Sequence, residues 1–272
     1  MNATQLAIAE PGRNTVAFLN TCPWQIVTHV PVGTTPVGIA GTPDGSQALV
    51  ANAGNGAASG SVSVIDLATR AVTKTITFPA AAPDGSPVVP NIIAVLPDGS
   101  RAYVSSHSCN PGSFVYMIDL ATLNVVGSPI SVGCFPSSLA VTPDGSQVWV
   151  SSRGDSRVDV FDTATNARVT GYNVALPTGI AFHPTGSTAY IGEGTGAGNV
   201  VVIDASTYQV ITRIPVGNLP HAVAVTPAGR YVFVTNGLSN SISQISTITN
   251  KVIRTIKLPN GLQHPLGLTF IQ

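Results

Sequence analysis

The chain has 272 residues, with 12 Lys and Arg against 12 Asp and Glu, so its formal net charge is zero. Charged residues make up 9% of the sequence, about a third of the usual share of roughly 25%. This argues against a nucleic-acid binder, which needs a basic surface to neutralise phosphates. The hydrophobic content of 44% can bury a core and excludes a disordered chain.

A repeat of about 45 residues organises the chain. It is anchored on turn prolines, on alanines three positions before them and on prolines seven positions before them. The turn prolines are Pro43, Pro97, Pro143, Pro184 and Pro227. Five coincidences of this kind do not arise by chance, so the repeat is an architectural unit.

Each repeat predicts four short strands. In chain order, the first complete repeat has a strand from Pro36, a Pro-Asp-Gly turn at 43–45 that is typical of type I, and an apolar second strand. A third strand at Val62–Asp66 and a fourth at Val72–Ile76 follow. Strands of about five residues in repeats of this length predict the blades of a β-propeller.

The two ends of the chain supply the remaining blade. The N-terminal segment predicts strands near Leu6–Ala9, Thr15–Leu19 and Gln25–Val30, and Pro265–Phe270 restarts a first strand. We therefore predict an all-β, six-bladed propeller of four-stranded antiparallel blades, closed by a split blade of three N-terminal strands and one C-terminal strand. This closure would remove open sheet edges. The expected blades of this single domain, 1–272, are 5–33 with 265–272, 36–78, 90–133, 136–174, 177–217 and 220–259.

The repeat resembles the YVTN family of β-propeller proteins. The resemblance is carried by Pro36–Gly45, Val62–Thr69 and Tyr231–Asn236, and it extends over nearly the whole chain. Similar repeats occur in surface-layer proteins, lactonase-like enzymes, streptogramin lyases and amine dehydrogenase subunits. The resemblance implies a propeller fold, and the streptogramin lyases imply a functional glutamate at a position similar to Glu193.

The scarce glutamates and histidines gather at one predicted face. Glu193 lies nine residues after its turn proline, and Glu10 falls at the same position of the split blade. His221 follows Pro220, and His264 precedes Pro265. Loops after second strands and before first strands share the channel-mouth face of a propeller. We therefore expect Glu193, His221, Glu10 and His264 to act as acid, base or metal ligands there, the alternative being that each is merely solvated.

Other polar residues of the same loops are expected to bind a ligand. These are Asn52, Asn91, His107, Arg153, Asp155 and Asn236. No cofactor is required by this pattern, although carboxylate and imidazole donors would suit a divalent ion such as Mg, Mn or Zn. The expected partner is a small molecule or a protein at the mouth face of a monomer, with no nucleic acid and no membrane insertion.

The three cysteines bear on location. Cys109 and Cys134 belong to two loops of one blade on the same face, which predicts a disulfide, with two free thiols as the alternative. A disulfide favours a periplasmic or secreted protein, although no signal peptide is visible in this chain and a cytoplasmic location stays open.

Two functions of different class remain. One is a rigid scaffold that binds a small ligand or a protein at the mouth face, because loops on a rigid fold carry recognition. The other is a lactonase-like hydrolase or a lyase that uses the Glu/His cluster. The sequence does not decide whether the protein is an enzyme.

Overall fold

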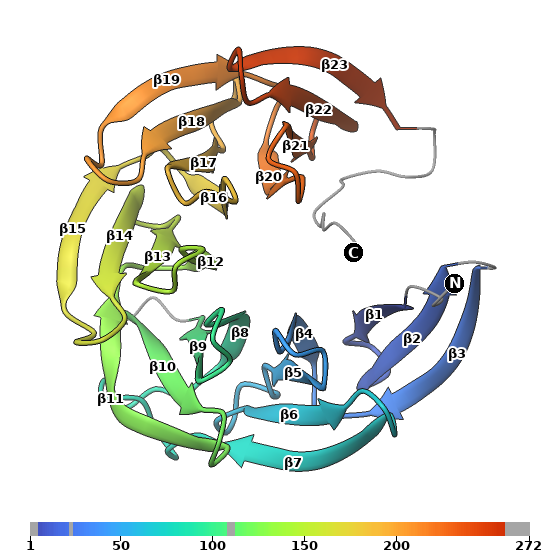
Figure 1. The fold of residues 1–272 in the computed structure, drawn as a ribbon. Coiled ribbons are helices and arrows are strands. Elements are labelled where there is room, and N and C mark those ends of the chain that lie inside the picture. Colours follow the sequence, from blue (N-terminus) through green and yellow to red (C-terminus); the bar gives the residue numbers. More distant parts are fainter. Residues whose placement is uncertain (1–4, 22–23, 108–111, 259–272) are drawn as a thin grey trace. The chain divides into compact units, whose positions relative to one another are not determined.

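The computed structural model describes residues 5–21, 24–107 and 112–258, and every regular element in these ranges is a β-strand. The strands form five four-stranded sheets and one three-stranded sheet, all antiparallel between chain neighbours (Figure 1). These sheets are the blades of a six-bladed β-propeller fold, which confirms the predicted fold class. The strand expected at 265–272 to complete the split blade lies outside the described residues. No helix able to span a membrane occurs in the described ranges.

The chain divides into two compact units. The first unit contains three blades. Blade 1 consists of β1 (Gln5–Glu10), β2 (Thr15–Thr21) and β3 (Trp24–Pro31). Blade 2 consists of β4 (Pro36–Gly41), β5 (Gln47–Asn52), β6 (Ser61–Asp66) and β7 (Ala71–Thr77). Blade 3 consists of β8 (Pro90–Val95), β9 (Arg101–Ser106), β10 (Ser113–Asp119) and β11 (Asn124–Val132).

The second unit contains the other three blades. Blade 4 consists of β12 (Pro136–Val141), β13 (Gln147–Ser152), β14 (Arg157–Asp162) and β15 (Arg168–Asn173). Blade 5 consists of β16 (Pro177–Phe182), β17 (Thr188–Glu193), β18 (Asn199–Asp204) and β19 (Val210–Pro215). Blade 6 consists of β20 (Pro220–Val225), β21 (Tyr231–Asn236), β22 (Ser241–Ser246) and β23 (Lys251–Lys257).

One edge of each blade carries the loops expected to be functional. The proline that opens a first strand pairs with the last residue of the second strand, as in Pro36 with Asn52 and Pro177 with Glu193. We call this the proline edge. The loop before the first strand and the loop after the second strand therefore lie at the same edge of a blade, as the sequence predicts.

A strained backbone conformation recurs just before these prolines. Thr35, Phe135, Leu176 and Leu219 have positive φ angles of 46 to 54°, which is rare for bulky residues and disfavoured before proline. Backbone hydrogen bonds hold three of them. The N–H groups of the residues that follow β5, β17 and β21 donate to the carbonyls of Thr35, Leu176 and Leu219 at 2.8 to 3.0 Å. The strain is therefore offset by a bond to the neighbouring loop.

The side chain of Trp149 is the centre of packing between blades 4 and 5. It is fully buried, and its ring lies 5.1 Å from Phe182, 5.7 Å from Tyr172 and 6.1 Å from Tyr208. Its Nε1 donates a hydrogen bond to Gln147 Oε1 at 3.0 Å, and Gln147 Nε2 donates to the Tyr208 hydroxyl at 2.7 Å. Apolar contact and satisfied polar groups thus join the two blades.

Most aspartates stabilise turns, as the repeat pattern suggests. Asp44 accepts hydrogen bonds from the Thr42 hydroxyl and from the Ser46 N–H and hydroxyl. Asp66 accepts from the N–H and hydroxyl of Thr69, three residues later. The ionised carboxylate accepts these bonds more strongly than the protonated acid, so the turns depend on the charge state of these residues.

This dependence predicts a loss of stability in acid. Side-chain hydrogen bonds, from Thr42 to Asp44 and from Ser206 to Asp204, are the largest cause that lowers each pKa from 3.8 to about 2. Because the folded pKa is depressed, the stabilisation is complete above about pH 4 and is lost as the pH falls toward about 2. Urea unfolding should give a lower midpoint at about pH 2.5 than at about pH 5. An unchanged midpoint would contradict the prediction.

Candidate functional site

A pocket of about 430 Å³ lies at the proline edge between blades 4 and 5. It is lined by Asp155, Ser156, Asn173, Ala175, Glu193 and Arg213. We call it the Glu193 pocket. Its volume lies in the range of small-molecule sites, about 300 to 1,000 Å³. The structure therefore brings together two of the residues expected from the sequence, Glu193 and Asp155.

Glu193 is a buried carboxylate that is only partly compensated. It ends β17 and pairs with Asn199 of β18, and the residue is 7% exposed. Asn199 Nδ2 donates to its Oε2 at 3.0 Å, and Arg213 Nε lies 3.7 Å from the same oxygen, beyond hydrogen-bond distance. Among the described residues, no group donates to Oε1. One oxygen of this carboxylate is therefore open at the wall of the pocket.

Charged side chains of both signs lie around the pocket. Asp155 is exposed in the turn between β13 and β14, and the Arg213 side chain on β19 is 48% exposed. Arg153 belongs to the same turn as Asp155, and its carbonyl accepts the Ser156 N–H at 3.3 Å. The lining therefore carries the carboxylates of Glu193 and Asp155 and the guanidinium of Arg213, so a ligand would meet charges of both signs.

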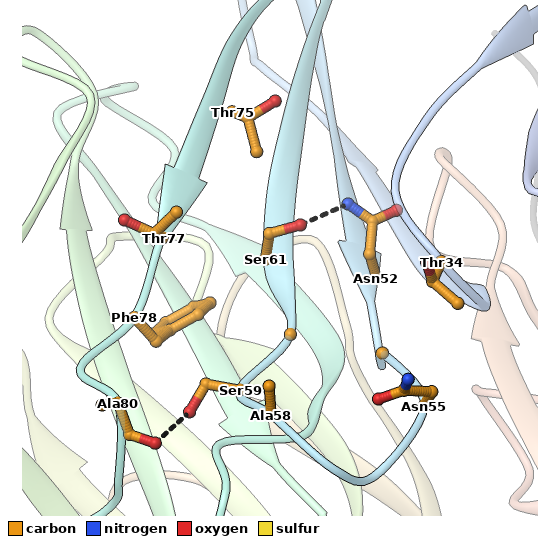
Figure 2. Close-up of a pocket in the computed structure, with 12 residues that line it drawn as sticks. Thr34, Asn52, Asn55, Ala58, Ser59, Ser61, Thr75, Thr77, Phe78 and Ala80 are labelled. Carbon is orange, nitrogen blue, oxygen red and sulfur yellow. Dashed lines mark hydrogen bonds between the residues drawn. The ribbon is translucent and has the colours of Figure 1, made fainter.

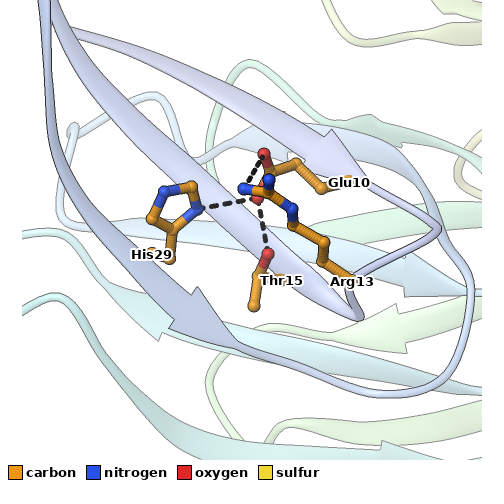
Figure 3. Close-up of polar contacts among 4 residues, drawn as sticks. All are labelled: Glu10, Arg13, Thr15 and His29. Carbon is orange, nitrogen blue, oxygen red and sulfur yellow. Dashed lines mark hydrogen bonds and ion pairs between the residues drawn. The ribbon is translucent and has the colours of Figure 1, made fainter.

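The other glutamate is engaged inside blade 1, in the other unit. Glu10 Oε2 accepts the Thr15 hydroxyl at 2.6 Å and lies 2.8 Å from His29 Nδ1 (Figure 3). Arg13 lies 3.7 Å from Oε1. The Thr15 hydrogen bond, followed by the His29 contact, lowers the pKa of Glu10. The carboxylate is therefore ionised and held by its own blade.

The predicted Glu/His cluster draws on both units. His221 lies half-buried on β20, one residue after Pro220, and His264 lies outside the described residues. The acid, base or metal role of Glu10, Glu193, His221 and His264 thus stays a prediction. Within the described ranges, no group of three or more His, Cys, Asp or Glu side chains could hold a metal ion.

Two asparagines form the same polar clamp in different blades. Asn52 Nδ2 donates to the hydroxyls of Ser61 and Ser63 at 3.1 and 3.0 Å. Asn236 Nδ2 donates to Ser241 and Ser243 at the same distances. Both side chains are buried, and both Oδ1 atoms lack a partner. The clamp joins the second strand to the third and leaves one unsatisfied acceptor in each blade.

Figure 2 shows the clamp of blade 2 at a second pocket of about 540 Å³. The amide nitrogen of Asn52 points toward Ser61, and Thr34 lies on the opposite side of the amide. Thr75 and Thr77 of β7 also line this pocket. Its lining is uncharged, in contrast to the Glu193 pocket.

The remaining expected ligand residues meet in blade 3. Asn91 Nδ2 lies 3.5 Å from His107 Nδ1, and the His107 ring lies 5.2 Å from the ring of Phe135. Cys134, the residue before Phe135, is disulfide-bonded. Cys22 and Cys109 both lie outside the described residues, so the pairing of Cys134 with Cys109 stays a prediction.

Sequence reasoning missed the partners of both glutamates. Asn199 lies opposite Glu193 on the adjacent strand β18, whereas Arg213 lies two strands from Glu193 and His29 lies two strands from Glu10. Cross-strand pairing would have identified Asn199, because residues opposite each other on adjacent strands are neighbours.

Comparison with known proteins supports the fold and goes no further. No family model matches the sequence, and no curated protein matches it. Hydrazine synthase from Kuenenia stuttgartiensis has a similar structure, with a TM-score of 0.79, 20% identity, and coverage of 93% of this chain and 83% of that chain. A functionally unknown protein from Desulfotomaculum acetoxidans DSM 771 has a TM-score of 0.76 at 17% identity, with 98% and 85% covered. The chain is thus of the six-bladed β-propeller class, and at these identities the likeness concerns the fold alone.

Proposed function

We propose that this protein is a rigid β-propeller scaffold that binds a small molecule in the Glu193 pocket. The observation that carries the proposal is the buried carboxylate of Glu193, whose Oε1 has no donor among the described residues. A carboxylate oxygen to which no side chain donates can accept a hydrogen bond from a ligand. The pocket is also large enough for an organic molecule.

The repeat and the cysteines bear on the type of propeller and on the location of the protein. We assign the chain to the YVTN type of propeller on the motifs of its repeats. The disulfide of Cys134 supports a periplasmic or secreted location, because such bonds persist in oxidising compartments. The rigid blades would hold the pocket in place without help from a second protein.

The test is a screen of chemically diverse small molecules by protein-observed NMR. At least one molecule is expected to shift the resonances of Asn199 and Arg213 in the wild-type chain. Glu193→Gln is expected to weaken that binding at least tenfold, because the charge at the pocket wall is lost. Asp98→Asn, which removes a turn carboxylate in blade 3, is the matched control and should bind as wild type. A screen in which no molecule perturbs the pocket would refute the proposal.

A second candidate, a hydrolase or a lyase, rests on the same open oxygen. Glu193 Oε1 is an acceptor that could take a proton from a bound substrate. Mass spectrometry of each binding molecule after incubation with the protein distinguishes the two functions. A chemically changed molecule would identify the protein as an enzyme. If the Glu193→Gln variant bound the molecule but left it unchanged, the proton transfer would be assigned to Glu193.

A further inference from the structure

The pocket of about 540 Å³ in blade 2 lies in the other compact unit from the Glu193 pocket (Figure 2). We infer that it is a second binding site, and that it takes a neutral polyhydroxylated ligand, the ring of a small sugar. Thr34 lines it from the loop before β4, and Thr75 and Thr77 line it from β7. We call it the threonine pocket. It adds a site to the proposed function and does not depend on the Glu193 pocket.

Pockets occupy the same position of the repeat in three blades. The fourth-strand residue that lines each of them is Thr75 in blade 2, Arg213 in blade 5 and Thr255 in blade 6. Each of these residues pairs with the third residue of the neighbouring third strand. The pocket is therefore a feature of the repeat, and the fourth strand changes its chemistry from one blade to another.

The threonine pocket is lined by groups that form hydrogen bonds without carrying charge. Thr77 lies opposite Ser61 on β6, and Thr75 lies two residues before Thr77 on the same face. Among the described residues, the hydroxyls of Thr34, Thr75 and Thr77 have no hydrogen-bond partner. None of the described residues that line the pocket is charged. Hydroxyls both donate and accept, as those of a sugar do, whereas an ion would lose water without meeting an opposite charge.

The Asn52 clamp fixes one of the hydroxyls at the wall. Asn52 is 1% exposed, and its Nδ2 donates to Ser61 Oγ at 3.1 Å. Because the oxygen of Ser61 accepts this bond, its O–H is left to donate to a ligand. The wall thus presents a positioned donor beside the threonine hydroxyls.

Phe78 supplies an apolar part of the same lining. It follows β7, and its ring packs against Tyr116 in an edge-to-face contact with centroids 5.1 Å apart. This contact holds the ring in place. A sugar ring carries C–H groups between its hydroxyls, so it can meet Phe78 and the threonines at once.

The test uses the full chain and five probes built on one ring. These are the neutral hexoses glucose, galactose and mannose, the cation glucosamine and the anion glucuronate. In protein-observed NMR, at least one hexose is expected to shift the amide resonances of Thr75 and Thr77 and to bind several-fold more tightly than either charged probe. Glu193→Gln should leave this binding unchanged. The inference is overturned if no hexose shifts these resonances, if a charged probe binds as tightly, or if Glu193→Gln abolishes the binding.

Substitutions on β7 locate the site. Thr75→Val and Thr77→Val remove one hydroxyl each and keep a β-branched side chain suited to a strand, so each should weaken hexose binding several-fold. Thr73→Val is the matched control, because Thr73 lies outside the lining and its hydroxyl donates to the Val64 carbonyl at 3.3 Å. Thr75→Arg installs the residue that blade 5 carries at this position, and should bind glucuronate more tightly than the wild type does. Hexose binding that none of the Thr75 and Thr77 variants changes would place the ligand elsewhere and refute the inference.

Discussion

Replacement of Trp149 by alanine is expected to lower the free energy of unfolding by about 3 to 5 kcal/mol. The indole is fully buried between blades 4 and 5 and contacts Tyr172, Phe182 and Tyr208. Its removal leaves a cavity that strands of two blades border, and it also leaves Gln147 Oε1 without its donor. The measurement is urea unfolding followed by circular dichroism, because the substitution removes one of only two tryptophans that fluorescence could report.

The matched variant is Trp149→Phe. It keeps an aromatic ring in the site and loses the Nε1 hydrogen bond, so its loss should be clearly smaller than that of Trp149→Ala. A loss of less than about 1 kcal/mol for Trp149→Ala would contradict the packing role assigned to this residue. Equal losses for both variants would place the energy in the hydrogen bond rather than in the ring.

A second large loss is expected at Gly198, which precedes β18 at the proline edge of blade 5. A Cβ atom on this residue would clash with the carbonyl oxygen of Gly217 and would lie 2.5 Å from Cδ of Pro220. Neither a backbone carbonyl nor a proline ring that opens β20 can move aside freely. We expect Gly198→Ala to cost about 3 kcal/mol, at the upper end of overpacking in a core. Thermal and urea unfolding both measure this cost.

The same loop provides the control. Gly196, two residues earlier, has no atom within 4 Å of the position its Cβ would take, so Gly196→Ala should change the free energy of unfolding by no more than about 0.5 kcal/mol. Similar losses at Gly196 and Gly198 would show that the loop requires glycine for its flexibility and not for close packing. Gly60 repeats the arrangement in the other unit, where its Cβ would lie 2.6 Å from Cδ of Pro90. Gly60→Ala should therefore resemble Gly198→Ala.

The fold was predictable because the same strand pattern occurs in several copies along the sequence. Five copies of the proline spacing place the strands, and the pairing of Pro177 with Glu193 follows from the antiparallel turn between them. The position of Glu193 at a loop-bearing edge could thus be predicted from the sequence. Its burial could not, because that depends on the loop from the preceding blade, where Ala175 lies against the pocket.

The partners of the functional residues were less predictable for a related reason. Glu10 and His29 are 19 positions apart and meet only because β1 and β3 flank β2 in one sheet. A charge pattern along the chain carries no information about a side chain two strands away. Arg213 was missed in the same way, since it lies on β19 and reaches Glu193 on β17 across β18.

At the left-handed residues that precede the first-strand prolines, the backbone conformation stays the same while the side chain varies. One backbone conformation is shared by Thr35, Phe135, Leu176 and Leu219. Their side chains nevertheless differ widely, from a small polar threonine to a large aromatic phenylalanine. The neighbouring loop holds the path of the chain at three of these positions through a backbone hydrogen bond, which does not depend on the identity of the side chain. A single codon change at such a position can alter what a blade presents while the scaffold stays the same. Propellers built on this repeat therefore possess a set of sites at which binding preference can evolve one blade at a time.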